Sequence, residues 1–234
     1  MKKLIFLICC FVLTGCTAKY DMTITSNNKF QESFTFIADN SILKMDNYTL
    51  KESIKQRIDG YKNAPELKDY KITYKIGEKN TTFHFKSPFL TIKQLNQSSI
   101  LKNGFEEIQL LKEGKNTIFQ TVGEYYYYHI FGETNDADGY SIDAQVSITP
   151  HYKVLKNNAD KVDEKTNTYT WYLKSNELEK SLQLKYSNQK RYDVIFNYYL
   201  KEYLPFLVIG GIILLILVTG GFIFYRKYKS TNEI

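Results

Sequence analysis

Cysteine is scarce in this chain of 234 residues, and its three cysteines all lie near the start, at Cys9, Cys10 and Cys16. Because no cysteine follows residue 16, the rest of the chain has no disulfide, no cysteine-ligated zinc and no cysteine nucleophile. The stability of any domain beyond that point must therefore come from its hydrophobic core.

Histidine is also scarce, and the common catalytic motifs are missing. His84, His129 and His151 are the only histidines, and none has a histidine partner at the short spacing that metal sites usually show. The chain contains no Gly-x-Ser-x-Gly elbow and no glycine-rich phosphate loop, and its acidic residues mostly neighbour lysine, as on solvated faces. We therefore expect no catalytic residue, no metal and no cofactor.

The first residues have the anatomy of an export signal. Lys2 and Lys3 precede residues 4–13, ten uncharged residues that are too few to cross a bilayer core of about 30 Å as a helix. The next four positions are occupied by Leu13-Thr14-Gly15-Cys16, which resembles the lipobox of bacterial lipoproteins. That resemblance implies cleavage before Cys16 and a diacylglyceryl anchor on its sulfur. The alternative is an ordinary signal peptide with a chance cysteine.

A long apolar run occupies the other end of the chain. Residues 204–225 contain no charge and as a helix would span about 33 Å, which is enough to cross a membrane. Tyr203 and Tyr225 lie at its two ends, where amphipathic rings favour the interface. The cations that follow predict a cytoplasmic tail by the positive-inside rule: Arg226, Lys227 and Lys229. A buried core helix is the alternative.

These end segments define the expected organisation and the charge of the part outside the membrane. The expected parts are a signal peptide (1–15), an extracytoplasmic domain (16–187), a juxtamembrane segment (188–203), a transmembrane helix (204–225) and a cytoplasmic tail (226–234). The whole chain carries +6, but the signal holds two lysines and the tail a net +2, which leaves +2 for residues 17–203. Because nucleic-acid binding requires clustered cations, we expect no nucleic-acid partner.

Alternating apolar and polar residues dominate the domain and predict half-buried strands. Three hairpins are expected, from residues 20–24 with 34–38, from 70–76 with 83–85, and from 104–111 with 117–122. Tyr140 to Ile148 predicts the longest strand, ended by Pro150, and residues 169–173 and 182–186 predict a final pair. Residues 187–203 predict either an interfacial helix or a last strand.

Two helices are expected between the hairpins. Thr49 and Glu52 have the spacing of a capping box and open an apolar stripe that contains Leu50, Ile54, Ile58 and Tyr61. Thr91 and Gln94 predict a second capping box, which opens a shorter helix with Ile92, Leu95 and Leu101. The expected fold class is therefore α+β, a mainly antiparallel sheet of hairpins with two short helices.

Short stretches of the domain resemble the LppM-like lipoprotein domain family. They are residues 19–25 (KYDMTIT), 148–154 (ITPHYKV), 158–163 (NADKVD) and 168–171 (TYTW). The similarity covers residues 17–187, and the layout of lipobox, α+β domain and C-terminal membrane helix is also similar. The resemblance implies a cell-envelope domain that binds lipid or glycolipid, with no enzymatic role and no catalytic residues to transfer.

Two further stretches are candidate sites. The possible ligand surface consists of Tyr125, Tyr126, Tyr127, Tyr128 and Phe131, whose rings could stack on sugars or enter lipid headgroups, or could instead belong to a strand buried on both faces. A second stretch weakly matches an EF-hand calcium loop: Thr134, Asp136, Asp138, Gly139 and Gln145. Because Gln145 stands where the loop needs a bidentate glutamate, a polar turn explains it better.

The sequence therefore predicts a non-enzymatic lipoprotein of the cell membrane, with its domain outside. It would bind lipid, glycolipid, a cell-wall polymer or an envelope protein. An accessory subunit of a membrane complex, acting through its transmembrane helix, is the alternative, and an envelope-polymer hydrolase is the third hypothesis. With both chain ends in the membrane, we expect the domain to lie close to the bilayer in a restricted orientation.

Overall fold

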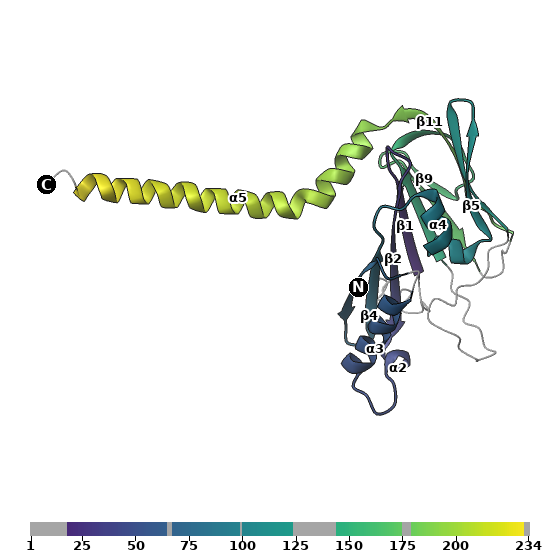
Figure 1. Cartoon of the computed structure of the whole chain (residues 1–234), viewed down its shortest axis with the longest axis horizontal. Coiled ribbons are helices and arrows are strands. Elements are labelled where there is room, and N and C mark those ends of the chain that lie inside the picture. The colour runs from purple at the N-terminus through teal and green to yellow at the C-terminus, as the bar shows by residue number, and fades with distance from the viewer. Residues whose placement is uncertain (1–17, 65–66, 99, 124–143, 175–178, 232–234) are drawn as a thin grey trace, which may run out of the picture. The chain divides into compact units, whose positions relative to one another are not determined.

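The computed structural model describes residues 18–64, 67–98, 100–123, 144–174 and 179–231. The chain divides between Lys190 and Arg191 into two compact units. The first unit contains β1 (Ala18–Ile24), β2 (Phe30–Asp39), α2 (Asn40–Leu43), α3 (Leu50–Asn63), β3 (Lys71–Ile76), β4 (Asn80–Lys86), α4 (Ile92–Ser98), the 3-10 helix η1 (Leu101–Gly104), β5 (Glu107–Glu113), β6 (Asn116–Val122), β7 (Ala144–Pro150), β8 (Tyr152–Asn157), β9 (Lys161–Asp163), β10 (Thr168–Leu173) and β11 (Gln183–Lys190). The second contains α5 (Tyr192–Thr231) (Figure 1).

The strands form two sheets. The larger has seven strands in the order β3-β4-β2-β1-β7-β10-β9, and the smaller has four in the order β5-β6-β11-β8. Every neighbouring pair is antiparallel except β1 and β7, which run parallel with Ala18 opposite Ala144. This arrangement, with helices between hairpins, confirms the α+β class expected from the sequence.

The three hairpins form where the alternation predicts them. β1 pairs with β2 so that Tyr20 faces Phe34, and the turn between them contains Asn28 in the left-handed region. β3 pairs with β4, and β5 with β6 around Gly114, which also has a positive φ. Each turn contains the polar or glycine residues that tight turns require.

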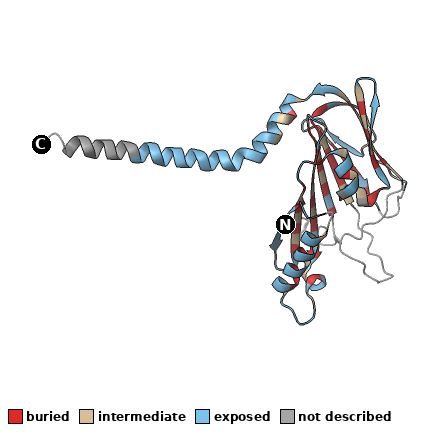
Figure 2. Ribbon diagram, in the orientation of Figure 1, coloured by how far each residue is buried: buried red, intermediate tan, exposed pale blue. Residues whose placement is uncertain are grey.

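One core joins both sheets and the helices. Alternate residues of the large sheet point inward, and the rings of Phe30 and Phe119, with centroids 6.2 Å apart, connect the two sheets. Tyr61 of α3 lies edge-on to Phe85 of β4 at 5.6 Å, so α3 covers the same inner face. Figure 2 shows this alternation as buried and exposed bands along the strands.

Both predicted capping boxes are present. In α3, Thr49 Oγ1 accepts from the Glu52 amide and the Glu52 carboxylate accepts from the Thr49 amide. In α4, the Thr91 amide donates to the Gln94 side chain at 2.9 Å and Thr91 Oγ1 accepts in return. Leu101, expected in this helix, lies instead in the separate turn η1.

The final strand pair expected from the sequence is wrong. β10 and β11 do not pair, because β10 joins β7 and β9 in the large sheet while β11 joins β6 and β8 in the small one. The strand predicted from Tyr140 is described from Ala144 onward, as β7, and its first four residues lie outside the described part of the chain. The short strands β8 and β9 and the helical turn α2 were not expected. Of residues 187–203, the first four complete β11 and the residues from Tyr192 onward belong to α5, so most of this segment is helical.

The chain enters the first unit near one end of β1 and leaves it near the other end. The segment that contains Cys16 joins the beginning of β1 at Ala18. At the other end of this strand, Ile24 O accepts from the His151 amide at 2.8 Å, and the next residue, Tyr152, pairs with Lys190. The seven residues of β1 span about 20 Å, so Ala18 and Lys190 lie near opposite ends of this strand.

α5 is a single helix of 40 residues that contains Pro205 and bends along its length (Figure 1). Its apolar stretch is long enough to span a membrane, and none of its most apolar window is buried within the chain. This exposure contradicts the alternative of a buried core helix.

Candidate functional site

The outer face of the seven-stranded sheet, which points away from the core, is polar. Hydroxyl side chains on neighbouring strands hydrogen-bond across it: Ser147 to Thr170 at 3.1 Å and Thr149 to Thr168 at 2.9 Å. His84, between two inward phenylalanines, lies on this face, where its Nδ1 is 3.1 Å from Thr35 Oγ1. Partial burial and the nearby Lys86 ammonium lower the pKa of His84.

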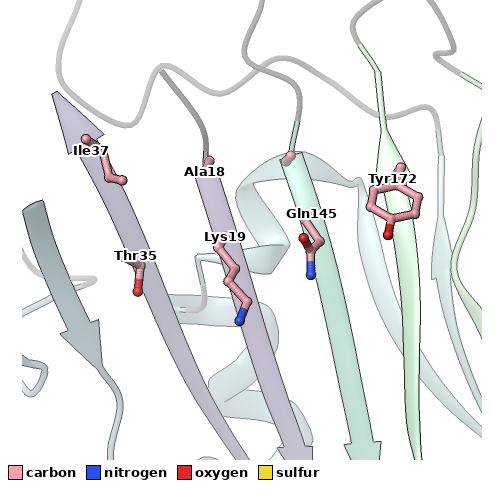
Figure 3. A pocket seen from close by; sticks show the side chains of 7 residues that line it. Ala18, Lys19, Thr35, Ile37, Gln145 and Tyr172 are labelled. Atoms are coloured by element: carbon pink, nitrogen blue, oxygen red, sulfur yellow. The ribbon is translucent and has the colours of Figure 1, made fainter. Parts of the chain in front are cut away.

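A groove of about 480 Å³ lies on this outer face, where β1 and β7 begin. Its lining comes from four adjacent strands: Ala18 and Lys19 of β1, Thr35 and Ile37 of β2, Ala144 and Gln145 of β7, and Tyr172 of β10. Figure 3 shows these strands side by side, with the longer labelled side chains on the outer face and Ala18 at the start of β1. Most of the lining surface is apolar, with an ammonium, an amide and two hydroxyls around it.

Two residues make the groove apolar by breaking the alternation of their strands. Ile37 follows Phe36 in β2 and Tyr172 follows Trp171 in β10, so each places an apolar side chain on the otherwise polar face. They are 37% and 42% exposed. An apolar residue at a position where the alternation expects a polar one is the sequence signal for both, and neither residue was among the predicted site residues.

The polar groups around the groove are held by their own contacts. Lys19 Nζ lies 3.5 Å from Asp21, in a pair that is about half exposed and is therefore weak. Gln145 donates to Ser147 Oγ at 3.3 Å. Chemically, the arrangement can hold an apolar group against Ile37 and Tyr172 and present one cation and one amide to a polar head.

A buried carboxylate lies on the opposite, inner face. Glu32 of β2 is fully buried and accepts hydrogen bonds from the hydroxyls of Tyr20 and Tyr70 and from the Ile100 amide at 2.9 Å. Burial raises the pKa of Glu32 above its ordinary value, although these hydrogen bonds and one from the Leu101 amide oppose the increase. Because these donors enclose the carboxyl in the core, we interpret it as structural.

His151 is a buried titratable group outside the groove. It follows β7 directly, and burial lowers the pKa of its imidazole to about 4, so the ring is neutral at physiological pH. Within the described residues, no cluster of three or more histidine, cysteine or acidic side chains could hold a metal ion.

The residues singled out from the sequence fall mostly outside the described part of the chain. Cys16, the aromatic run Tyr125, Tyr126, Tyr127, Tyr128 and Phe131, and His129 all lie outside it, as do residues 134–139 of the weak calcium match. Gln145, the last residue of that match, lies in β7 and lines the groove. The groove is therefore a site that only the arrangement of four strands reveals.

Comparisons with known proteins give one structural similarity. No protein-family model matches the chain, and no curated protein matches it. Among solved structures, the chain is similar to the folded domain of LppM from Mycobacterium tuberculosis, determined by NMR. The two share 12% sequence identity with a TM-score of 0.45, over 76% of this chain and 92% of that domain.

Proposed function

We propose that this chain is a non-enzymatic cell-envelope lipoprotein, anchored by lipidated Cys16 and by α5, which binds a membrane amphiphile in the groove at the start of β1. The position of the groove carries the proposal. Ala18, which lines it, is the second residue after Cys16, and two extended residues reach about 7 Å. A lipid anchor on Cys16 would therefore hold the groove beside the outer leaflet.

The size and lining of the groove support an amphiphilic ligand. Its 480 Å³ lies within the roughly 300–1,000 Å³ of small-molecule sites, which combine apolar walls with a few polar groups. Ile37 and Tyr172 provide the apolar contact, and the Lys19 ammonium suits an anionic headgroup. None of the described residues that line the groove carries a carboxylate, and this favours binding over polymer hydrolysis, which requires a carboxylate pair.

Binding of a fluorescent short-chain phosphatidylglycerol to the full chain in detergent micelles tests the proposal. Ile37→Ser and Tyr172→Ala should each weaken binding about tenfold, because each removes roughly 1.5 kcal/mol or more of apolar burial. Leu155→Ser is the matched control, since Leu155 is an exposed apolar residue of β8 in the other sheet. Equal binding by all three variants would mean that the groove is not the site.

The second anchor has its own test. Cys16→Ser should leave the full chain in the membrane fraction, because α5 is long and apolar enough to hold it there. Release of this variant into the medium would refute membrane anchoring by α5.

An accessory-subunit function acting through α5 is the second candidate. The most apolar window of the helix is unburied within the chain, and a Cβ added at Gly210 or Gly211 would meet nothing within 4 Å, so this face is open to a neighbouring helix. Replacing residues 204–225 with an unrelated spanning helix separates the two functions. The groove-binding protein should retain its ligand after the exchange, whereas an accessory subunit should lose its complex.

A further inference from the structure

The first three turns of α5 carry four aromatic residues on one face. Tyr192, Phe196, Tyr199 and Tyr203 follow one another at steps of four, three and four residues. At 100° per residue these positions fall within an arc of roughly 60°, which we call the aromatic stripe. Its members are between 44% and 74% exposed, although rings of this size are usually buried.

The rest of these turns differs from the aromatic stripe. Asn197 and Lys201 lie on the opposite side of the helix, roughly 140° and 180° from Tyr192, and both are exposed. Within the stripe, the rings of Tyr199 and Tyr203 stack with centroids 6.2 Å apart. The exposed polar residues therefore lie away from the aromatic stripe, although the buried Val194 and the half-buried Tyr198 lie near Lys201 on the same side.

The length of this segment decides where the aromatic stripe can lie. The twelve residues 192–203 extend about 18 Å along the helix, whereas the headgroup layer adds only about 5–8 Å to each side of the hydrocarbon core. If α5 continued straight out of the membrane, Tyr203 would reach the headgroups but Tyr192 and Phe196 would face water. The whole stripe reaches the interface only if the helix bends.

Pro205 provides that bend at the junction with the apolar run. It has no amide hydrogen for the carbonyl of Lys201, four residues earlier, and its ring pushes that turn open. α5 contains this proline and bends along its length in Figure 1. The segment on the N-terminal side of Pro205 can therefore take a direction different from that of the spanning part.

We propose that residues 192–203 lie along the outer surface of the bilayer, with the aromatic stripe inserted among the lipid headgroups and Asn197 and Lys201 facing water. The inference rests on the proposed span of α5 across the membrane. The bilayer is the occupant because the stripe continues into the apolar run without a break in the helix. Tyrosine rings, with an apolar body and a polar hydroxyl, suit that layer.

Tryptophan scanning of the full chain in lipid vesicles tests the proposal. The vesicles consist of phosphatidylcholine and phosphatidylglycerol, with lipids brominated close to the headgroup as quenchers. Phe196→Trp should lose most of its fluorescence and shift to the blue, whereas Lys201→Trp, one turn along on the opposite face, should lose little. The wild-type signal is subtracted, since it comes from Trp171 alone, which is fully buried in the core.

A third variant, Leu214→Trp, separates this inference from the proposed function. With deep-brominated lipids it should be quenched; an unquenched Leu214→Trp would overturn the membrane span and with it this proposal. If Leu214→Trp is quenched but Phe196→Trp and Lys201→Trp behave alike, the span stands and the stripe does not face lipid. Protection of Phe196→Trp that grows with the ratio of protein to lipid would assign the stripe to a second copy of the chain.

Discussion

The two faces of the seven-stranded sheet are made by alternate residues of the same strands and have different roles. On β4, Phe83 and Phe85 point into the core while His84 between them points outward. On β10, Trp171 is buried while the adjacent Tyr172 lines the groove. Because the inner face supplies the apolar burial that stabilises the domain, the outer face can present a groove at little cost in stability.

The largest expected effect comes from truncating the inner face. Phe83→Ala should lower the free energy of unfolding by about 3–5 kcal/mol, because it leaves a cavity in the core. His84→Ala, at the adjacent outward position, should lower it by less than about 1 kcal/mol, since it removes one partly exposed hydrogen bond. Urea unfolding of the full chain in micelles, followed by Trp171 fluorescence, measures both. Equal losses would contradict the division of roles between the faces.

The buried carboxylate is the next most sensitive position. Glu32→Ala should lower the free energy of unfolding by about 3 kcal/mol, because it strands the Tyr20 and Tyr70 hydroxyls and the Ile100 amide in the core. Ser33→Ala, the adjacent outward residue, serves as its control in the same urea unfolding experiment. A Glu32→Ala variant as stable as Ser33→Ala would show that this hydrogen-bonded cluster contributes nothing.

Acid should weaken the domain through His151. The folded-state pKa of about 4 lies below the ordinary 6.5, so the stabilisation from neutral His151 is complete above pH 6.5 and is lost as pH falls towards 4. The slope is at most about 1.4 kcal/mol per pH unit. Urea unfolding across this range should show a flatter profile for His151→Gln than for wild type.

The pKa of Glu32 is shifted upward in the folded state, so its effect on stability has the opposite sign. A raised carboxyl pKa lowers the free energy of unfolding as pH rises above 4.5.

The smallest expected effect is at the helix that covers the inner face. Thr49→Ala removes one half of the capping box of α3 and should lower the free energy of unfolding by about 1 kcal/mol. Thr49→Ser retains the hydroxyl and should stay within about 0.5 kcal/mol of wild type. Thermal unfolding followed by circular dichroism distinguishes the two. A larger loss than that of Glu32→Ala would show that α3, rather than the sheet, limits stability.

Local features of this fold could be predicted from the sequence, and long-range pairings could not. The hairpins and both capping boxes depend on residues a few positions apart, such as Thr49 with Glu52, and they were predicted correctly. The parallel pairing of β1 with β7, and the separation of β10 from β11, depend on strands far apart in sequence. Alternation shows which face of a strand is buried but does not identify its neighbour.

The candidate site was less predictable than the fold. The groove needs residues from four strands, so no single stretch contains it, and only the exceptions Ile37 and Tyr172 could have indicated it. Glu32, a charge between the inward residues Phe30 and Phe34, was a similar exception. Residues that break the pattern of their strand were therefore the informative ones.

The position of β1 between the two chain exits has a mechanical consequence. If Cys16 and α5 are both held in the membrane, as proposed, tension between these anchors enters the domain at Ala18 and leaves it at Lys190, near opposite ends of β1. β1 is paired with β2 and with β7 along all seven of its residues. Such a pull loads these hydrogen bonds together in shear instead of opening them one by one, so the doubly tethered domain should resist force along the membrane plane.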